Sequence, residues 1–385
     1  MQHKYTLMAF FFSSFILFTA GAGADTHKSL PQNGTSDGQA LVNALKIEPP
    51  PSFCSETVPL NEAEVKERLE REFLYALDNK DQVILWLKRA NRFFPHIEQV
   101  LQKNAVPDDL KYIAIAESAL KPLATSNKGA VGHWQFIEGT GSRYGMKINS
   151  DIDERRDFYK STEAAAAYLK NLYALFGSWT LAAAAYNMGE EGLKAEMLVQ
   201  KVNNYYQLYL PQETQRYVFR ILSAKIIMSN PRKYGFSLAK EDLYQPLQFD
   251  QLEITCNESV PISLVARAAN TYFKVIKDLN PQLKKYYLPA GKHQILIPKG
   301  SAAGFDKRYE NLLQQWHDEK KENVYIIKKG DKLSTIAARF GVPMKAIVIW
   351  NGITFNKKMV PGDKLFIFSS NFNPENNTEK SDAEN

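Results

Sequence analysis

The residue with the clearest chemical potential is Glu117, a carboxylate within an apolar helical pattern. The residues seven, four and three positions before it are Leu110, Ile113 and Ala114, so all four share one face of a predicted helix. Burying an ionised carboxylate costs free energy unless the group has a partner or a function. Burial also raises the pKa of a carboxyl group, as a general acid at neutral pH requires. The pattern therefore predicts an acid/base residue, with a salt-bridged core glutamate as the alternative.

The segments around Glu117 place it near the end of a helix, where a side chain can reach a cleft. The predicted helix begins at Pro107, because the fixed φ of proline suits the first turn. It ends near Lys121, because the residue before a proline is disfavoured in helical conformation. A glycine-rich stretch, residues 129–145, follows directly. We expect this stretch to form a loop beside the carboxylate.

Residues 59–245 carry helical patterns throughout and predict a mainly α-helical domain. Its first segment has an apolar stripe formed by Val65, Leu69, Phe73 and Leu77. Two alanine runs, 164–167 and 182–185, favour helix and allow close helix packing. A last helix opens at Pro211 and ends before Pro231.

Two shorter details of this domain are also predicted. Residues 82–90 and 94–103 carry separate apolar patterns, which we interpret as two core helices. Ser161 or Thr162 is the expected N-cap of the first alanine-rich helix, since a hydroxyl there can accept a hydrogen bond from a free backbone amide.

An internal repeat follows the helical domain. Asn280 aligns with Asn351 at an offset of 71 residues, since 351 − 280 = 71, and Gly291 aligns with Gly362 at the same offset. Each unit has the pattern of a strand, two short helices and a closing strand. The units are residues 250–299 and 323–368.

Residues 300–322 connect the two repeats. We expect a linker that forms a helix, because its apolar residues recur at helical spacing: Phe305, Tyr309, Leu312 and Trp316.

The two ends of the chain differ from the domains in composition. Residues 1–24 have a basic start, an apolar core and small residues at a cleavage position, which predicts a secretory signal peptide. Residues 25–58 are interpreted as a flexible leader and residues 369–385 as a disordered tail. No cysteine directly follows the apolar run, and the first cysteine is Cys54, so a lipoprotein anchor is not indicated. We therefore expect an exported protein, periplasmic or associated with the cell envelope, with no integral membrane segment in the mature chain.

Composition indicates which partners, disulfides and metal sites the chain allows. The 385 residues have a net charge of +6 without a long basic run, which suits a polyanionic polymer but not nucleic-acid binding. The only cysteines are Cys54 and Cys256. An oxidising compartment would allow them to form a disulfide, and the sequence leaves this open. The six histidines show no metal-ligand spacing.

Four elements in order resemble the catalytic domain of bacterial lytic transglycosylases, which has a goose-type lysozyme-like fold. They are Glu117-Ser118, Ser126 with Gly129-Ala130-Val131-Gly132-His133-Trp134-Gln135, Ala185-Tyr186-Asn187-Met188-Gly189, and Glu213-Thr214-Gln215-Arg216-Tyr217-Val218. The second repeat, 323–368, resembles a LysM module. The first, 250–299, resembles a degenerate LysM module, because Ser259-Val260 stands where a Gly-Asp pair is usual. The resemblance implies a multidomain protein, with a mainly α lysozyme-like catalytic domain followed by two small α+β (βααβ) LysM modules.

The resemblance also implies a reaction and a substrate. Glu117 would be the single acid/base that cleaves the β-1,4 bond between N-acetylmuramic acid and N-acetylglucosamine, leaving a 1,6-anhydromuramic product. The implied partner is the glycan strand of peptidoglycan, and no cofactor or metal is implied. The oligomeric state is not implied.

Further site residues follow from the same motifs. Those implied to bind substrate are Ser126, Gln135, Tyr186, Asn187 and Glu213. Those implied to bind glycan in the second LysM module are Gly330, Asp331, Leu333, Asn351 and Ile353. Two positions depart from the family pattern: His133 replaces an apolar residue, and Glu138 stands where proline is frequent.

Two other functions remain open from the sequence. A hydrolytic muramidase would need a second carboxylate, for which Asp151, Asp153 and Glu154 are candidates. These acids lie beside Arg155 and Arg156, so salt bridges are the simpler interpretation. A non-catalytic wall-binding protein would use the helical domain only as a scaffold.

Overall fold

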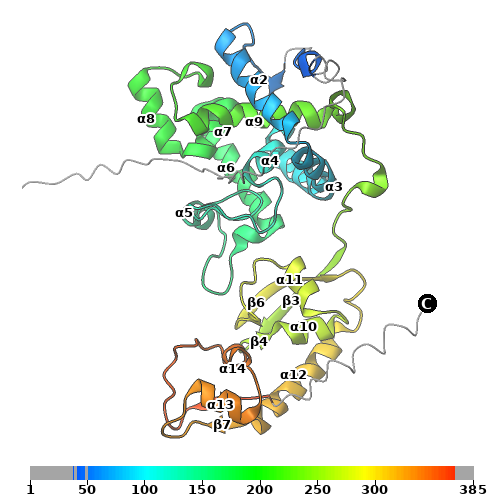
Figure 1. Cartoon of the computed structure of the whole chain (residues 1–385), viewed down its shortest axis with the longest axis vertical. Helices are drawn as coiled ribbons and strands as arrows, with labels where there is room; N and C mark the ends of the chain where they lie inside the picture. The colour runs from blue at the N-terminus through cyan, green and yellow to red at the C-terminus, as the bar shows by residue number, and fades with distance from the viewer. Residues whose placement is uncertain (1–37, 39–40, 48–50, 369–385) are drawn as a thin grey trace, which may run out of the picture. The chain divides into compact units, whose positions relative to one another are not determined.

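A computed structural model of the chain describes residues 38, 41–47 and 51–368. The predicted signal peptide (1–24), most of the leader and the tail (369–385) lie outside the described residues. The chain forms two compact units, one ending at Leu247 and the other beginning at Gln248 (Figure 1).

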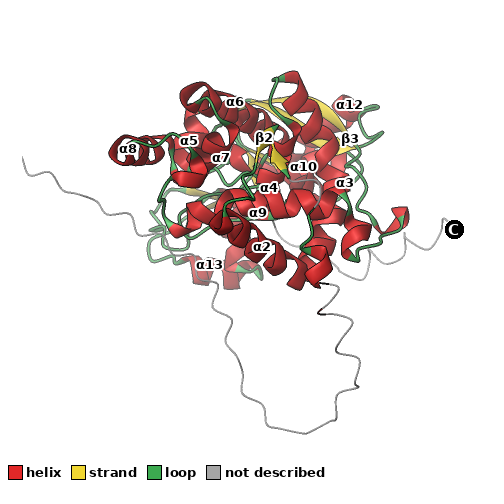
Figure 2. Cartoon of the chain, turned by 90° about the horizontal axis from the view of Figure 1, so that it is seen from above, coloured by secondary structure: helices red, strands yellow, loops and turns green. Residues whose placement is uncertain are grey.

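The first unit is helical, with one short hairpin and several single turns of 3-10 helix (Figure 2). The hairpin consists of β1 (Ser52–Phe53) and β2 (Glu56–Thr57). The α-helices are α2 (Ala63–Asp78), α3 (Lys80–Lys103), α4 (Tyr112–Ser118), α5 (Glu138–Arg143), α6 (Phe158–Phe176), α7 (Trp179–Met188), α8 (Glu190–Gln200) and α9 (Gln212–Ser229). The 3-10 turns are η1 (Asp108–Lys111), η2 (Glu154–Arg156), η3 (Tyr205–Gln207), η4 (Pro231–Tyr234) and η5 (Lys240–Asp242).

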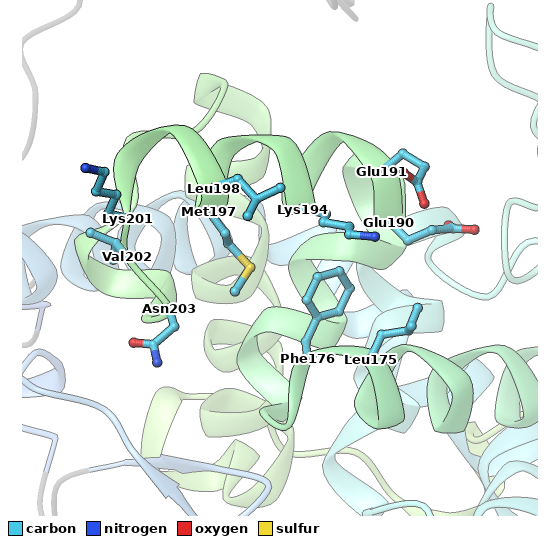
Figure 3. Close-up of a pocket in the computed structure, with 10 residues that line it drawn as sticks. All are labelled: Leu175, Phe176, Glu190, Glu191, Lys194, Met197, Leu198, Lys201, Val202 and Asn203. Atoms are coloured by element: carbon cyan, nitrogen blue, oxygen red, sulfur yellow. The ribbon is translucent and has the colours of Figure 1, made fainter.

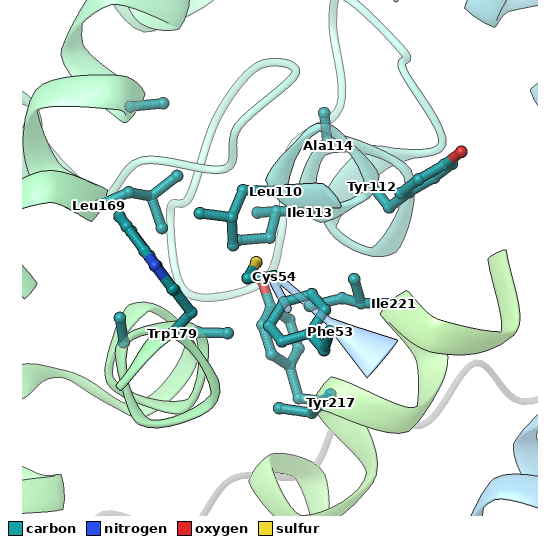
Figure 4. Close-up of a cluster of buried hydrophobic side chains, with 14 of the residues drawn as sticks. Phe53, Cys54, Leu110, Tyr112, Ile113, Ala114, Leu169, Trp179, Tyr217 and Ile221 are labelled. Atoms are coloured by element: carbon teal, nitrogen blue, oxygen red, sulfur yellow. The ribbon is translucent and has the colours of Figure 1, made fainter. Parts of the chain in front are cut away.

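Helix α9 is the centre of the first unit, because it packs against α2, α4 and α7. Its inward face is fully or almost fully buried at Tyr217, Ile221 and Ala224. Figure 4 shows Tyr217 and Ile221 in the same cluster as Ile113 of α4 and Trp179 of α7. The alanine run of α7 has no exposed side chain, so neighbouring helices approach it closely, as expected from the sequence.

Helix α3 differs from the expected pair of short helices. It is continuous through Pro95, which removes one amide donor without ending the helix. Phe94 and Ile97 on either side of the proline are buried, and this packing outweighs the lost hydrogen bond. The N-cap of α6 also differs from the prediction: Asp157 accepts hydrogen bonds from the amides of residues 159 and 160, and the helix begins at Phe158.

The end of the predicted flexible leader is part of the folded unit. Phe53 of the hairpin is fully buried in the core, and Cys54 is also buried. The carboxylate of Glu56 accepts hydrogen bonds from the backbone amides of Trp179 and Thr180 at 2.5 and 3.1 Å. Glu56 thus satisfies free amides at the start of α7, and its negative charge interacts favourably with the positive end of the helix dipole. The leader prediction is wrong for residues 51–58, since a cap supplied from a distant segment leaves no local pattern.

The two cysteines are free thiols. Cys54 belongs to the first unit and Cys256 to the second.

The second unit begins with a βααβ module whose two long strands pair antiparallel. Strand β3 (Phe249–Cys256) pairs with β6 (Gly291–Pro298), with Cys256 opposite Gly291. Between them lie β4 (Val260–Pro261), α10 (Ile262–Ala268), α11 (Phe273–Leu279) and β5 (Tyr287–Leu288). The second βααβ module consists of β7 (Val324–Ile326), α13 (Leu333–Phe340), α14 (Met344–Asn351) and β8 (Lys364–Phe366), with β7 antiparallel to β8.

The segment between the modules is helix α12 (Phe305–Glu322), in agreement with the helical pattern. It is not a free linker, because it packs on α10 and buries Phe305 and Trp316. Among the described residues no single helix has the length and apolarity to span a membrane. The pair α13 and α14, bent by 106°, meets those criteria only jointly.

Equivalent asparagines confirm the internal repeat. The side-chain amide of Asn280 donates to the carbonyls of Ile276 and Leu296, and its oxygen accepts from the amide of Leu296. Asn351 makes the same three bonds, to residues 347 and 366. The offset is 71 at the asparagines but 70 at the closing strand, since 366 − 296 = 70, so the constant offset of 71 does not extend to that strand.

Candidate active site

Glu117 lies in the last turn of α4, as expected, but the helix ends earlier than Pro122 requires. Ala119 and Leu120 adopt left-handed conformations, with φ of 52° and 58°. The hydroxyl of Ser118 donates to the carbonyl of His133 at 2.7 Å and so joins the helix end to the glycine-rich loop. The chain therefore turns directly after Glu117, and this turn holds the carboxylate at the helix end.

Two tyrosines from other helices interact with the Glu117 carboxyl group, Tyr217 by a hydrogen bond and Tyr186 electrostatically. The Tyr217 hydroxyl of α9 donates a hydrogen bond of 2.5 Å to Oε1 of Glu117. The Tyr186 hydroxyl of α7 donates to the carbonyl of Trp134 at 2.7 Å. Burial raises the pKa of both tyrosines, and the charge of Glu117 raises each further. Three helices, α4, α7 and α9, thus meet at one site. We call its residues Glu117, Tyr186, Glu213 and Tyr217 the acidic cluster.

The environment of Glu117 sets its protonation near neutrality. Burial raises the pKa of its carboxyl group to about 7, although the hydrogen bond from Tyr217 opposes the shift. The charge of Glu213 raises this pKa further, and Arg220 lowers it. The residue keeps some exposure to solvent. Glu117 can therefore hold a proton at pH 7 and also lose it, which are the two requirements of an acid/base group.

Glu213 is the second carboxylate near Glu117, and it is paired with Arg220, which lies two turns further along α9. The guanidinium donates to both oxygens of Glu213, at 2.6 and 2.8 Å. Burial alone would raise the pKa of Glu213, but the pairing with Arg220 holds it below its ordinary value. Near neutral pH Glu213 is therefore ionised, whereas Glu117 can be protonated. Environment alone gives the two glutamates different protonation states.

Asn187 lies beside the same helix. Its side-chain oxygen accepts a hydrogen bond of 2.9 Å from the hydroxyl of Thr214. The contact joins the end of α7 to the start of α9. The structure thus brings Tyr186, Asn187 and Glu213 to the Glu117 side of the unit from two distant motifs.

The loop predicted to bind substrate is held by its own side chains. Ser126 Oγ accepts hydrogen bonds from the amides of Lys128 and Ala130, at 3.3 and 3.1 Å. The Gln135 side-chain amide donates to the carbonyls of Ala124 and Gly132, at 3.1 and 2.8 Å. Both side chains therefore shape the loop, and only their remaining donor or acceptor capacity is left for a ligand.

Gly132 and Arg155 also hold this loop in place, through a close backbone approach and through hydrogen bonds. Gly132 has φ of 85°, and a Cβ atom there would meet the carbonyl oxygen of Arg155 at 2.0 Å. The Arg155 guanidinium donates to the carbonyls of Gly129 and Phe136 and pairs with Asp153. Only glycine is compatible with this close approach.

Trp134 and His133, the two residues of the loop motif with ring side chains, are buried in the core of the first unit. Trp134 is fully buried, and its indole nitrogen donates to the hydroxyl of Thr162 at 3.0 Å. His133 is 1% exposed and packs against Phe93 and Phe158. Burial lowers the pKa of His133 to about 3, so the ring is neutral. Glu138, the other departure from the family pattern, is exposed at the first turn of α5.

A row of aromatic rings leads away from Tyr186. Its ring contacts that of Tyr168, with centroids 5.3 Å apart, and Tyr168 contacts Tyr144 at 5.1 Å. The Tyr168 hydroxyl donates to Glu190, which also pairs with Arg143. This network joins α5, α6 and α8 next to the acidic cluster.

A separate hollow of about 560 Å³ lies between the end of α6 and α8 (Figure 3). Phe176, Met197 and Leu198 form its apolar part, and Glu190 lies at one end. Glu117 does not line this hollow. Among the described residues, no group of three or more His, Cys, Asp or Glu side chains could hold a metal ion.

The residues predicted to bind glycan in the second module hold its two loops. Leu333 is part of the core, and Ile353 packs against it. The Asp331 carboxylate accepts from the hydroxyl of Tyr325 and the amide of Lys328, while Gly330 has φ of 90°. These bonds and the three made by Asn351 leave mainly the loop backbone for ligand contacts.

Sequence reasoning missed Tyr217 and Arg220 as site residues. Tyr217 was recognised within a motif, but its hydroxyl contact with Glu117 spans 100 residues. The available signal was the spacing on α9: residues 213, 217 and 220 lie at i, i+4 and i+7, on one helical face.

Comparison with known proteins agrees with this geometry. Residues 95–207 match the Transglycosylase SLT domain, residues 249–314 the Lytic transglycosylase MltD LysM-like domain, and residues 325–368 the LysM domain. The chain is 31% identical over 315 residues to membrane-bound lytic murein transglycosylase D from Escherichia coli K12, covering 78% of this chain and 69% of the relative. The protein of the same name from E. coli O6:H1 has the same identity and coverage.

A solved structure, the 70 kDa soluble lytic transglycosylase from E. coli, is 18% identical with a TM-score of 0.33. It covers 54% of this chain and only 35% of that one, and this likeness is too low to support an argument. The fold class expected from the resemblance is confirmed by the family matches and the observed elements: a helical, lysozyme-like SLT domain precedes two LysM-type βααβ modules. By its domains and by its identity to these relatives, the chain belongs to the family of lytic murein transglycosylases.

Proposed function

We propose that Glu117 is the single acid/base of a reaction that cleaves the β-1,4 bond between N-acetylmuramic acid and N-acetylglucosamine. In the first step its proton passes to the glycosidic oxygen as the C1–O bond breaks. In the second, the ionised Glu117 takes the proton of the muramic C6 hydroxyl, whose oxygen bonds to C1. The product is a 1,6-anhydro ring, and no water is consumed.

The observation that carries the proposal is the buried setting of Glu117 in the last turn of α4, where the Tyr217 hydroxyl of α9 bonds its carboxylate. This burial raises the pKa of Glu117 to about 7. A group with this pKa can donate in the first step and accept in the second without a large energetic penalty for either form. The C6 hydroxyl belongs to the same sugar, so the second step is intramolecular and needs no bound water. Glu213, held ionised by Arg220, is suited to stabilise positive charge that develops on the sugar.

The contacts of the other acids favour this reaction over hydrolysis. Asp153 is buried and paired with Arg155 through both oxygens, at 2.8 Å each. Glu154 pairs with Lys160 and accepts from the amide of Lys147. These contacts support the simpler interpretation of both acids as salt-bridge partners.

The glycan strand of peptidoglycan is the proposed substrate, as the names of the relatives indicate for those proteins. We also propose that Tyr186, Asn187, Glu213, Ser126 and Gln135 contact it. The LysM modules are proposed to hold the same polymer. An envelope location is consistent with this substrate, and the predicted signal peptide would deliver the chain there.

Digestion of purified peptidoglycan in H2(18)O, followed by mass spectrometry, tests the reaction. We expect products ending in 1,6-anhydromuramic acid without the heavy isotope. Reducing ends that carry one heavy oxygen would instead support a hydrolytic muramidase. E117Q keeps the shape of the side chain but removes the proton donor, so its turnover should fall by about 10²–10⁴-fold. Turnover of E117Q equal to that of the unmodified protein would show that Glu117 is not the acid/base, and absence of turnover in both proteins would support a non-catalytic wall-binding role.

A further inference from the structure

Glu72 is a buried carboxylate outside the acidic cluster. It lies on α2, is 3% exposed, and accepts hydrogen bonds from Nε and Nη2 of Arg216 at 2.6 and 3.1 Å. Arg220 Nε lies 3.6 Å from its other oxygen, and Arg71 Nε lies 3.5 Å from the first. A buried carboxylate is costly unless it is paired, so these guanidinium groups must stay in place around it.

Arg220 connects this carboxylate to the acidic cluster. Its Nη1 and Nη2 atoms donate to both oxygens of Glu213, while its Nε faces Glu72. The planar guanidinium thus has one edge on each acid, which fixes its orientation. Glu213 and Arg220 both act electrostatically on Glu117. Contacts from α2 therefore reach Arg220 and, through it, Glu213, and the charges of these two groups act on the Glu117 carboxyl group.

We infer that Glu72 is a positioning residue for the reaction, which holds Arg216 and Arg220 so that Arg220 keeps Glu213 fixed beside Glu117. The inference rests on the proposed role of Glu117. Helix α2 lies outside residues 95–207, which match the SLT domain, so this element adds to the active site from beyond the matched part.

The charge of Glu72 gives the proposal a measurable sign. Removing it makes the field at Glu117 more positive, which favours ionised Glu117 and moves the basic limb of the pH profile to lower pH. The other titratable or charged groups near Glu117, Glu213 and Glu72 are the same in all the variants compared below. Tyr186 and Tyr217 lie near Glu117, and Lys128 lies near Glu213. Arg71 and Tyr205 lie near Glu72.

The test is the pH profile of kcat/KM on soluble glycan strands. E72Q is expected to lower kcat/KM several-fold and to move its basic limb down by about 0.5 pH unit. R216Q removes a positive charge from the same cluster and should move the limb upwards. E72Q/R216Q restores the charge sum and should return the limb towards its original position. E72D keeps the charge, so it should keep the limb position while kcat falls.

E67Q is the matched control, because Glu67 is an exposed glutamate of the same helix and the charge change is identical. It should leave the profile unchanged. If the basic limbs of the kcat/KM profiles of E72Q and R216Q coincide with that of the unmodified protein, Glu72 is merely structural and the inference is wrong. If E72Q does not fold, R216Q and E72D still decide. Failure of the proposed function is distinct: the unmodified protein would then form no anhydro product, or E117Q would stay active.

Discussion

At the scale of single residues, the acidic cluster combines two opposing effects on one carboxyl group. Burial favours protonated Glu117, whereas the Tyr217 hydroxyl stabilises the ionised form. A hydrogen bond to a charged group is worth about 1.5–3 kcal/mol, which is large enough to move a pKa by about one unit or more. Tyr217 therefore tunes the acid rather than merely filling space.

Y217F is predicted to raise the pKa of Glu117, because the ionised carboxylate loses its donor. The basic limb of the kcat/KM profile should then move to higher pH by about one unit. Y206F is a suitable control, since the buried hydroxyl of Tyr206 has no hydrogen-bond partner among the described residues. A limb that does not move in Y217F, or that moves equally in Y206F, would contradict the tuning role.

His133 is predicted to weaken the fold in mild acid. Its pKa is lowered to about 3 in the folded state by burial, whereas an unfolded histidine titrates near its ordinary value of about 6.5. The unfolded state therefore binds an extra proton as the pH falls through about 6.5, and stability drops by about 1.4 kcal/mol per unit below that. His133 and its ring contacts lie within the helical unit.

H133L removes this term while keeping the apolar contacts. Between pH 6.5 and pH 5 its free energy of unfolding should fall by about 2 kcal/mol less than that of the unmodified protein. Urea unfolding followed by tryptophan fluorescence measures the difference. From pH 7 to pH 8 the two proteins should change in parallel, and parallel behaviour below pH 6 as well would refute the prediction.

At the scale of elements, the turn after α4 is the most strained part of the site. Ala119 and Leu120 are successive non-glycine residues in the left-handed region, which costs about 1–2 kcal/mol for each. Leu120 is fully buried, so its packing compensates for the strain, while Ala119 is only partly buried. The burial of Leu120 and the hydrogen bond from Arg89 to the carbonyl of Ala119 maintain the sharp turn after Glu117 in spite of this strain.

A119G is expected to stabilise the helical unit by about 1 kcal/mol, because glycine adopts positive φ without steric cost. A116G, in the helical part of α4, should destabilise it by about the same amount through lost helix propensity. Chemical denaturation of both variants gives the two signs. Destabilisation by A119G similar to that by A116G would show that the turn is not strained.

At the scale of the whole molecule, the chain joins a catalytic unit to two βααβ modules. Under the proposed function, tethered modules raise the local concentration of the enzyme on an extended polymer without adding contacts at the reacting bond. The benefit should depend on the substrate: large on insoluble walls with many sites and small on short soluble strands.

A chain ending at Leu247 is predicted to keep its kcat/KM on soluble glycan strands. On intact insoluble peptidoglycan its activity should fall by about 10-fold or more. N351A in the full chain is the companion variant. It removes the two hydrogen bonds that join α14 to Phe366 of β8 and a third to Ile347 within α14, so it should unfold the second module. Equal activity of the truncated and full chains on both substrates would contradict the tethering role.

Local patterns in the sequence were enough for the elements that carry the site. The periodic apolar residues predicted α9 almost to its ends, and they placed Glu117 in the last turn of its helix. The equivalent asparagines 280 and 351 revealed the repeat, which the structure confirms apart from a one-residue shift. These features depend on residues a few positions apart, so local spacing is sufficient to predict them.

The tertiary structure alone decided which groups meet Glu117. Tyr217 is 100 residues away, Arg216 meets Glu72 across 144 residues, and Glu56 caps a helix more than 120 residues further on. Periodicity reports that a helix face is buried, but it carries no information on which distant side chain covers that face. The same limit explains Pro95, which local rules place at a helix boundary and burial keeps inside α3. The sequence by itself thus determined the carboxylate Glu117, its helix and the family resemblance, because these depend on local spacing. The packing of α2, α7 and α9 determined which distant groups surround that carboxylate and set its protonation.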